Sequence, residues 1–168
     1  MAAWQFAFVV IPVAGIIRMH GRMVDVLPEF AARMPDASFD ADQACSNYWQ
    51  GIDNTSMHGM AKSMLPVATS WSDEATMYGN STADDIQIWE DSVNVRLDCR
   101  NLNVALLTAV LDASCAANCC LVLLEGGRII APVPQLVTDA LHASAAARFV
   151  DNPRRFLQST GRMFNTGS

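Results

Sequence analysis

Two runs of alternating apolar and polar residues lie next to each other in the middle of this sequence, and they constrain its fold more than any other feature. The runs are Asp85–Glu90 and Val93–Asp98, separated by Asp91-Ser92. A period of two is typical of half-buried strands, and the short break predicts a hairpin. Helical and buried apolar patterns follow, so the segment 84–157 indicates an α+β fold.

The remaining patterns extend this to a single α+β domain over residues 1–168, with a mixed or mainly antiparallel sheet and helices packed chiefly on one face. The other predicted strands are Trp4–Ile11, Pro66–Trp71, Thr76–Tyr78, Cys119–Leu124 and Arg128–Ala131, the last two joined by Gly126-Gly127 as a two-residue turn. The predicted helices are Met23–Met34, Ile52–Leu65, Leu102–Ala117 capped by Asn101, Gln135–Val150 and Asn152–Leu157. We expect Pro12–Gly15 to form a turn, Arg18–Gly21 a loop, and residues 161–168 a frayed tail.

The apolar N-terminal stretch favours a core strand over a signal segment. No basic residue precedes it, Pro12 and Gly15 interrupt it, and Arg18 ends it before it is long enough to span a bilayer. Aromatic and β-branched residues dominate it, as in a buried strand. We therefore expect no membrane association.

The cysteines predict neither disulfides nor a metal site. They are odd in number, form no Cys-x-x-Cys pair, and are far in sequence from the three histidines; they are Cys45, Cys99, Cys115, Cys119 and Cys120. Small buried side chains in a reducing compartment fit this usage, which favours a cytoplasmic location.

Negative charge is concentrated in the middle of the chain. The net charge is −6, but the segment Asp25–Asp98 holds thirteen acidic residues against Arg33, Lys62 and Arg96, which gives −10 there and +4 elsewhere. An acidic segment repels nucleic acid and anionic membranes and attracts basic partners. We expect a basic protein partner and no nucleic acid.

No recognisable catalytic or cofactor motif occurs in the sequence. Gly126-Gly127 lacks the further glycine and the lysine of a phosphate-binding loop. His58 could act as a general base, and the Asp98/Arg100 pair could carry chemistry, so a small enzyme is an alternative. Structural roles fit both better: alternating charges at Arg96, Asp98 and Arg100 suit a solvated sheet face. We predict no catalytic residues, cofactor or metal.

Large aromatic rings lie close in sequence to carboxylates, a pattern typical of protein interfaces. Tryptophan and tyrosine anchor such interfaces, and flanking acids select a basic partner. Asp84 and Asp85 are expected in a loop, and strict alternation places Trp89 opposite Ile86 and Ile88. The predicted partner-binding residues are Trp71, Asp73, Glu74, Tyr78, Asp84, Asp85, Trp89, Glu90 and Asp91.

A family resemblance covers roughly Leu65 to Leu157. Its residues, in chain order, are Trp71, Tyr78-Gly79, Ile86-x-Ile88, Val95-x-Leu97-Asp98-x-Arg100, Cys120-Leu-Val-Leu, Gly127-Arg-Ile-Ile-x-Pro132 and Ser144-Ala-x-Ala-x-Phe149-Val-x-Asn152-Pro153-x-x-Phe156-Leu. This order resembles small α+β immunity proteins encoded beside bacterial secreted toxins. The resemblance implies a non-enzymatic antitoxin that occludes a basic toxin; it carries over no contact residue. A self-associating subunit, for example a homodimer that covers Trp89, is a further alternative.

Overall fold

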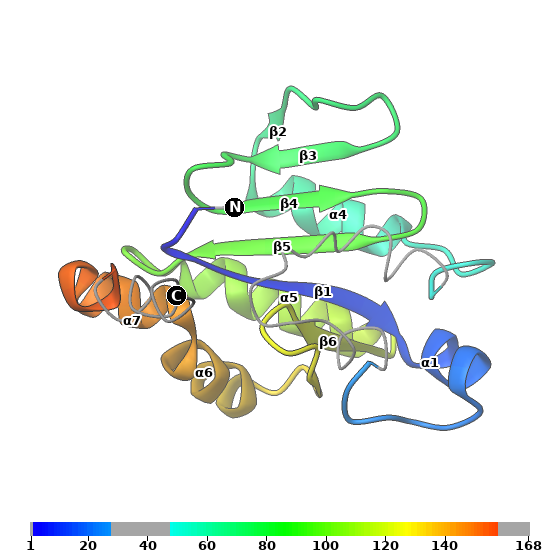
Figure 1. Cartoon of the computed structure of the whole chain (residues 1–168). Coiled ribbons are helices and arrows are strands. Elements are labelled where there is room, and N and C mark those ends of the chain that lie inside the picture. Colours follow the sequence, from blue (N-terminus) through cyan, green and yellow to red (C-terminus); the bar gives the residue numbers. More distant parts are fainter. Residues whose placement is uncertain (1, 28–47, 158–168) are drawn as a thin grey trace, which may run out of the picture.

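The computed structural model describes residues 2–27 and 48–157 of the chain, which form an α+β domain around one antiparallel sheet (Figure 1). The sheet has seven strands in the order β2-β3-β4-β5-β1-β6-β7. The strands are β1 (Gln5–Pro12), β2 (Val67–Ala68), β3 (Thr76–Gly79), β4 (Asp85–Ile88), β5 (Val93–Asp98), β6 (Cys119–Leu123) and β7 (Ile129–Ile130). The labelled helices are α1 (Val13–His20), α4 (Thr55–Met64), α5 (Val104–Ala116), α6 (Pro134–Ala143) and α7 (Ala145–Asp151). Residues 153–157 are also helical.

Strand β1 lies near the centre of the sheet and is buried along its whole length. It pairs with β5 on one side and β6 on the other, both antiparallel. Phe8 and Val10 contribute to one apolar cluster, whereas Val9 and Ile11 contribute to a second. Successive side chains of a strand point to opposite faces, so both faces of β1 are covered. The predicted N-terminal core strand is confirmed.

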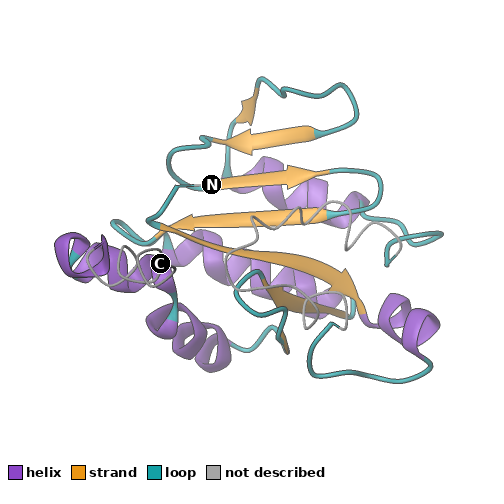
Figure 2. Ribbon diagram, in the orientation of Figure 1, coloured by secondary structure: helices purple, strands orange, loops and turns teal. Residues whose placement is uncertain are grey.

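The larger cluster packs the sheet against α4 and α5, which lie together behind it (Figure 2). Met57 and Ala61 of α4 and Leu106 and Val110 of α5 are buried in this cluster. On the other face, Ile16 of α1 joins a smaller cluster. The prediction of helices chiefly on one face is confirmed.

Helix α5 connects two parallel strands that have β1 between them. Because β5 and β6 each run antiparallel to β1, the unit β5–α5–β6 is a split β-α-β arrangement. The N-cap of α5 is Asn103, whose side chain accepts a hydrogen bond from the Leu106 amide at 3.0 Å. Asn101 was therefore the wrong cap, although the helix itself is confirmed.

Two elements near the N-terminus differ from the sequence-based predictions. Residues 13–20 form helix α1, where a turn and a loop were predicted. Pro12 precedes its first turn, and Gly21 ends it with a φ of 71°. Residues 23–27 are not helical, because Val26 bridges to Arg128 at the edge of the sheet. The rest of the predicted helix Met23–Met34 lies outside the described residues.

Two boundaries near the C-terminus also differ. The predicted helix Gln135–Val150 divides at Ser144, whose main chain is extended, with a ψ of 158°. The Ser144 hydroxyl accepts a hydrogen bond from the Ala147 amide as the N-cap of α7. Strands β6 and β7 are joined by Leu124–Gly127 rather than by Gly126-Gly127 alone, since Leu123 and Arg128 still bond through their main chains. The predicted tail 161–168 lies outside the described residues.

The described cysteines are free thiols, and only part of the prediction about them is confirmed. Cys119 and Cys120 are buried, whereas Cys115 is exposed. Burial, aided by the neighbouring Cys120, raises the pKa of Cys119 to about 12, so its thiol stays protonated. No group of metal-ligating side chains occurs among residues 2–27 and 48–157. None of the described helices has both the length and the apolar character needed to cross a membrane.

Two helical glycines offer a matched test of how α1 packs. A Cβ at Gly15 would overlap the main-chain carbonyl of Tyr48, whereas a Cβ at Gly59 in α4 would meet nothing. We expect Gly15→Ala to lower the free energy of unfolding by about 1–3 kcal/mol through overpacking. Gly59→Ala should raise it by about 0.5–1 kcal/mol through helix propensity. Urea unfolding measures both; a Gly15→Ala protein as stable as wild type would contradict the close approach of α1 to Tyr48.

Candidate interaction site

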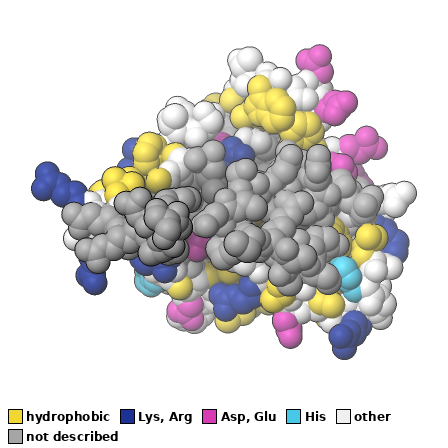
Figure 3. Space-filling view, in the orientation of Figure 1, with side chains coloured by type: hydrophobic (Ala, Val, Ile, Leu, Met, Phe, Trp, Pro, Cys, Tyr) yellow, Lys and Arg dark blue, Asp and Glu magenta, His cyan; other side chains and the backbone are white. Residues whose placement is uncertain are grey.

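Six of the nine predicted partner-binding residues lie together at one end of the sheet. The loop between β2 and β3 and the turn between β4 and β5 supply them, and we call them the acidic aromatic surface: Trp71, Asp73, Glu74, Trp89, Glu90 and Asp91. Acidic side chains gather along this edge of the molecule, beside a hydrophobic patch (Figure 3). Asp73, Glu74 and Glu90 are exposed and form no ion pair with any described residue.

An edge-to-face pair of tryptophans joins the two segments of this surface. The Trp71 and Trp89 ring centroids lie 5.2 Å apart with an interplanar angle of 60°. Strand β4 ends at Ile88, and the amide of Trp89 donates to the Ser92 carbonyl at 2.8 Å, which closes the turn. Trp71 thus packs against the Trp89 ring, which strict alternation places opposite Ile86 and Ile88. Trp71 itself remains 69% exposed.

Asp84 and Asp85 were both expected in a loop, but only Asp84 lies in one, and both make contacts within the protein. Asp85 begins β4 and has 0% exposure. Its carboxylate lies 3.4 Å from the Arg96 guanidinium, and burial raises its pKa although Arg96 opposes the shift. Asp84 accepts a hydrogen bond from the Asp98 amide at 2.8 Å. The Asp85 carboxylate is therefore enclosed, whereas Asp84 is half-buried.

Tyr78 is also internal and pairs with the histidine considered as a general base. Tyr78 is 4% exposed, and its hydroxyl lies 3.0 Å from His58 Nδ1. Burial lowers the pKa of His58, and the charge of Asp53 partly offsets this. Burial also raises the pKa of Tyr78. The pair therefore joins α4 to β3 as two neutral groups near pH 7.

The Asp98/Arg100 pair likewise supports the fold. The Arg100 guanidinium donates to both Asp98 oxygens, at 2.9 Å from Nε and 2.6 Å from Nη2, and these bonds lower the pKa of Asp98. Arg100 also lies over the Trp4 ring, 4.2 Å from its centroid. The prediction of a solvated sheet face was wrong here, because Asp98 is buried. Its partner Arg100 is the exposed member of the pair.

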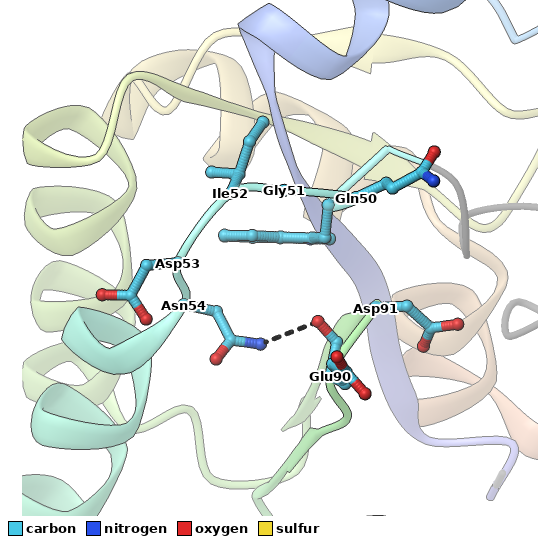
Figure 4. Close-up of a pocket in the computed structure, with 8 residues that line it drawn as sticks. Gln50, Gly51, Ile52, Asp53, Asn54, Glu90 and Asp91 are labelled. Atoms are coloured by element: carbon cyan, nitrogen blue, oxygen red, sulfur yellow. Dashed lines mark hydrogen bonds between the residues drawn. The ribbon is translucent and has the colours of Figure 1, made fainter.

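A pocket of about 460 Å³ adjoins the acidic aromatic surface. Its walls are the segment 49–54 and residues Glu90 and Asp91. Asn54 Nδ2 donates to the main-chain oxygen of Glu90 at 3.4 Å, which ties the two walls together (Figure 4). It also donates to the main-chain oxygen of Trp89 at 2.7 Å. The carboxylates of Asp53 and Asp91 point away from one another in this view. The pocket is therefore lined by acidic residues, but the carboxylates of Asp53 and Asp91 do not point toward a common centre.

Sequence reasoning missed the segment 49–54 as a support for this surface. Trp49 is buried and its Nε1 donates to the Val10 carbonyl at 2.9 Å, so the segment is fixed to the end of β1. Asp53 Oδ1 accepts from the amide and hydroxyl of Thr55 at the start of α4, and the hydroxyl bond is the main cause of the lowered pKa of Asp53. The Asp-x-Thr spacing was a local signal for this helix start.

Neither His58 nor the Asp98/Arg100 pair is among the residues that line this pocket. The exposed Trp71 ring and the exposed carboxylates of Asp73, Glu74 and Glu90 give the acidic aromatic surface an apolar group beside negative charge. Comparisons with models of protein families, with curated proteins and with solved structures gave no match.

The lowered pKa of His58 predicts how the unfolding free energy of the protein depends on pH. The unfolded histidine titrates near 6.5, and its folded pKa lies lower because of burial. On acidification the unfolded state therefore binds the proton first, so the contribution of His58 is present above pH 6.5 and is lost as pH falls. We expect the unfolding free energy of wild type, minus that of His58→Gln, to decrease between pH 7.5 and 5. A difference that stays constant or grows in urea titrations across this range contradicts the assignment.

Proposed function

We propose that this chain is a bacterial immunity protein, a non-enzymatic antitoxin that binds and occludes a basic toxin through the acidic aromatic surface. The observation that carries the proposal is the exposed Trp71 ring against Trp89, beside the exposed carboxylates of Asp73, Glu74 and Glu90, which form no ion pair within residues 2–27 and 48–157. Tryptophan is the residue type most enriched among the energetically dominant contacts of protein interfaces.

The charge around this tryptophan pair selects the kind of partner. No lysine or arginine occurs between residues 63 and 95, a stretch that includes all six members of the acidic aromatic surface. Arg96, the next basic residue, is already paired with Asp85. The exposed carboxylates therefore produce a local negative field that attracts a basic protein and repels nucleic acid.

The internal roles of the other candidates support binding rather than catalysis. His58 bonds to Tyr78 and Asp98 to Arg100, and the thiols of Cys119 and Cys120 are buried. The resemblance to immunity proteins supplies the specific class, since those proteins neutralise toxins by contact. A cytoplasmic location belongs to this proposal, because free thiols persist in a reducing compartment.

A genetic experiment tests the proposed class. The gene beside the one for this chain should encode a secreted toxin with a basic domain that arrests growth when produced alone in the cytoplasm. Co-production of this chain should restore growth, and the two proteins should purify as a complex. Absence of such a gene, or toxicity that persists although both proteins are made, would contradict the proposal.

A charge-reversal experiment tests the surface. Asp73→Lys/Glu74→Lys should slow association with that toxin domain about tenfold or more at low salt, because steering by these exposed charges is lost. The effect should shrink at high salt, where charges are screened over about 8 Å or less. Asp112→Lys/Asp139→Lys, at exposed positions of α5 and α6, is the matched control and should leave association close to wild type. Stopped-flow fluorescence measures the rates; equal slowing by both pairs would place the interface elsewhere.

A further inference from the structure

The two edge strands of the sheet differ in whether another described segment pairs with their outer side. At β7, the Ile129 amide donates to the Asp25 carbonyl at 2.8 Å, and the Leu27 amide donates to the Gly127 carbonyl at 3.0 Å. The segment 25–27 thus continues the sheet beyond β7. At the other edge, no described residue pairs with the outer side of β2. An edge strand without a neighbour presents unpaired main-chain groups to any other chain.

The register of β2 shows which groups it presents. The Gly79 amide donates to the Pro66 carbonyl at 2.8 Å, so Pro66 faces β3. Val67 is opposite Tyr78, and Ala68 is opposite Met77. Hydrogen-bonded and non-hydrogen-bonded pairs alternate in an antiparallel ladder, so the N–H and C=O of Val67 point away from β3. The Val67 side chain is 63% exposed, which leaves this position open to a partner.

The open edge leads directly into the acidic aromatic surface. Trp71 follows β2 in the chain, and Asp73 and Glu74 lie in the loop that returns to β3. The Trp71–Trp89 contact brings Glu90 to the same end of the sheet. Main-chain pairing sites, an exposed ring and carboxylates are therefore adjacent along one border of the molecule. Figure 1 shows β2 and the loop that joins it to β3 at this border.

We infer that β2 is a docking edge for an extended, lysine- or arginine-bearing segment of the partner, which adds to the sheet as a further strand. This inference rests on the proposed function and names its mode of recognition. Strand addition takes its affinity from main-chain hydrogen bonds and its specificity from side-chain contacts. Because β2 is only two residues long, Trp71 and the carboxylates must supply much of the selectivity.

Charge distinguishes this occupant from a second copy of the chain. Edge-to-edge pairing of two β2 strands would bring together two chains that each have a net charge of −6 and carry exposed carboxylates at Asp73, Glu74 and Glu90. Like charges across an interface oppose association. Lys62, in the last turn of α4, is the nearest basic residue in the sequence and is a single charge against these three. An extended basic segment can pair with the open edge of β2 and also form ion pairs with the nearby carboxylates.

The probe for the test is the synthetic peptide acetyl-(Lys-Val)4-amide, binding to the full chain. A peptide of the same sequence, N-methylated at every residue, keeps the charge but has no backbone N–H on either edge to donate to a ladder. We expect the first peptide to bind at least tenfold more tightly and to slow hydrogen exchange of the Val67 amide severalfold. Equal binding of the two peptides, or an unchanged exchange rate for Val67 at saturation, overturns strand addition. Failure of both peptides to bind at millimolar concentration overturns it as well.

Variants of the protein separate the contribution of main-chain pairing at β2 from the contribution of the carboxylates. Val67→Pro removes the outward N–H and should weaken binding of the unmethylated peptide about tenfold, whereas Val67→Thr keeps the N–H and should bind within about twofold of wild type. Both proteins are first checked for an unchanged unfolding midpoint, and the exchange measurement on wild type stands if Val67→Pro does not fold. If Asp73→Lys/Glu74→Lys weakens toxin binding while Val67→Pro does not, the proposed function stands and the edge inference fails.

Discussion

The double burial of β1 is the constraint on which the rest of this structure depends. One strand from the start of the chain pairs with β5 and β6, which follow much later in the sequence. Its alternate side chains seed a cluster on each face of the sheet. Both clusters require cover, and α4 and α5 supply it on one side, while α1 contributes on the other. Loss of β1 would leave β5 and β6 without their shared neighbour.

Tyr48 and Trp49 connect this core to the surface. Adjacent in sequence, they enter different clusters, and the Trp49 indole bonds to the end of β1. The same segment then reaches Asn54, whose amide holds the Trp89 carbonyl of the β4–β5 turn. The position of Trp89, and through it the contact with Trp71, is therefore fixed by packing that begins at the central strand.

Carboxylates that are close in sequence divide between interior and surface, and this division shapes the candidate site. Asp85 enters the sheet and pairs with Arg96, while Asp84 accepts a main-chain bond. Asp73, Glu74 and Glu90 lie on loops and turns, where water solvates them. A buried carboxylate requires partners and so contributes to the fold, whereas an exposed one without partners remains available to an incoming cation. The internal pairing of Asp85 therefore leaves the exposed loop acids to determine the charge of the surface.

The sequence by itself determined the strands, the α5 stripe and the acidic character of the middle segment. These signals are local: alternation in 85–98 and helical spacing at Leu106 and Val110 specify which face is apolar regardless of what covers it. Only the tertiary structure decided the strand order, the burial of Asp85, the break at Ser144 and the helix over 13–20. Each depends on which distant segment packs against the residue, as Tyr48 does at Gly15. A local sequence pattern does not identify that neighbour.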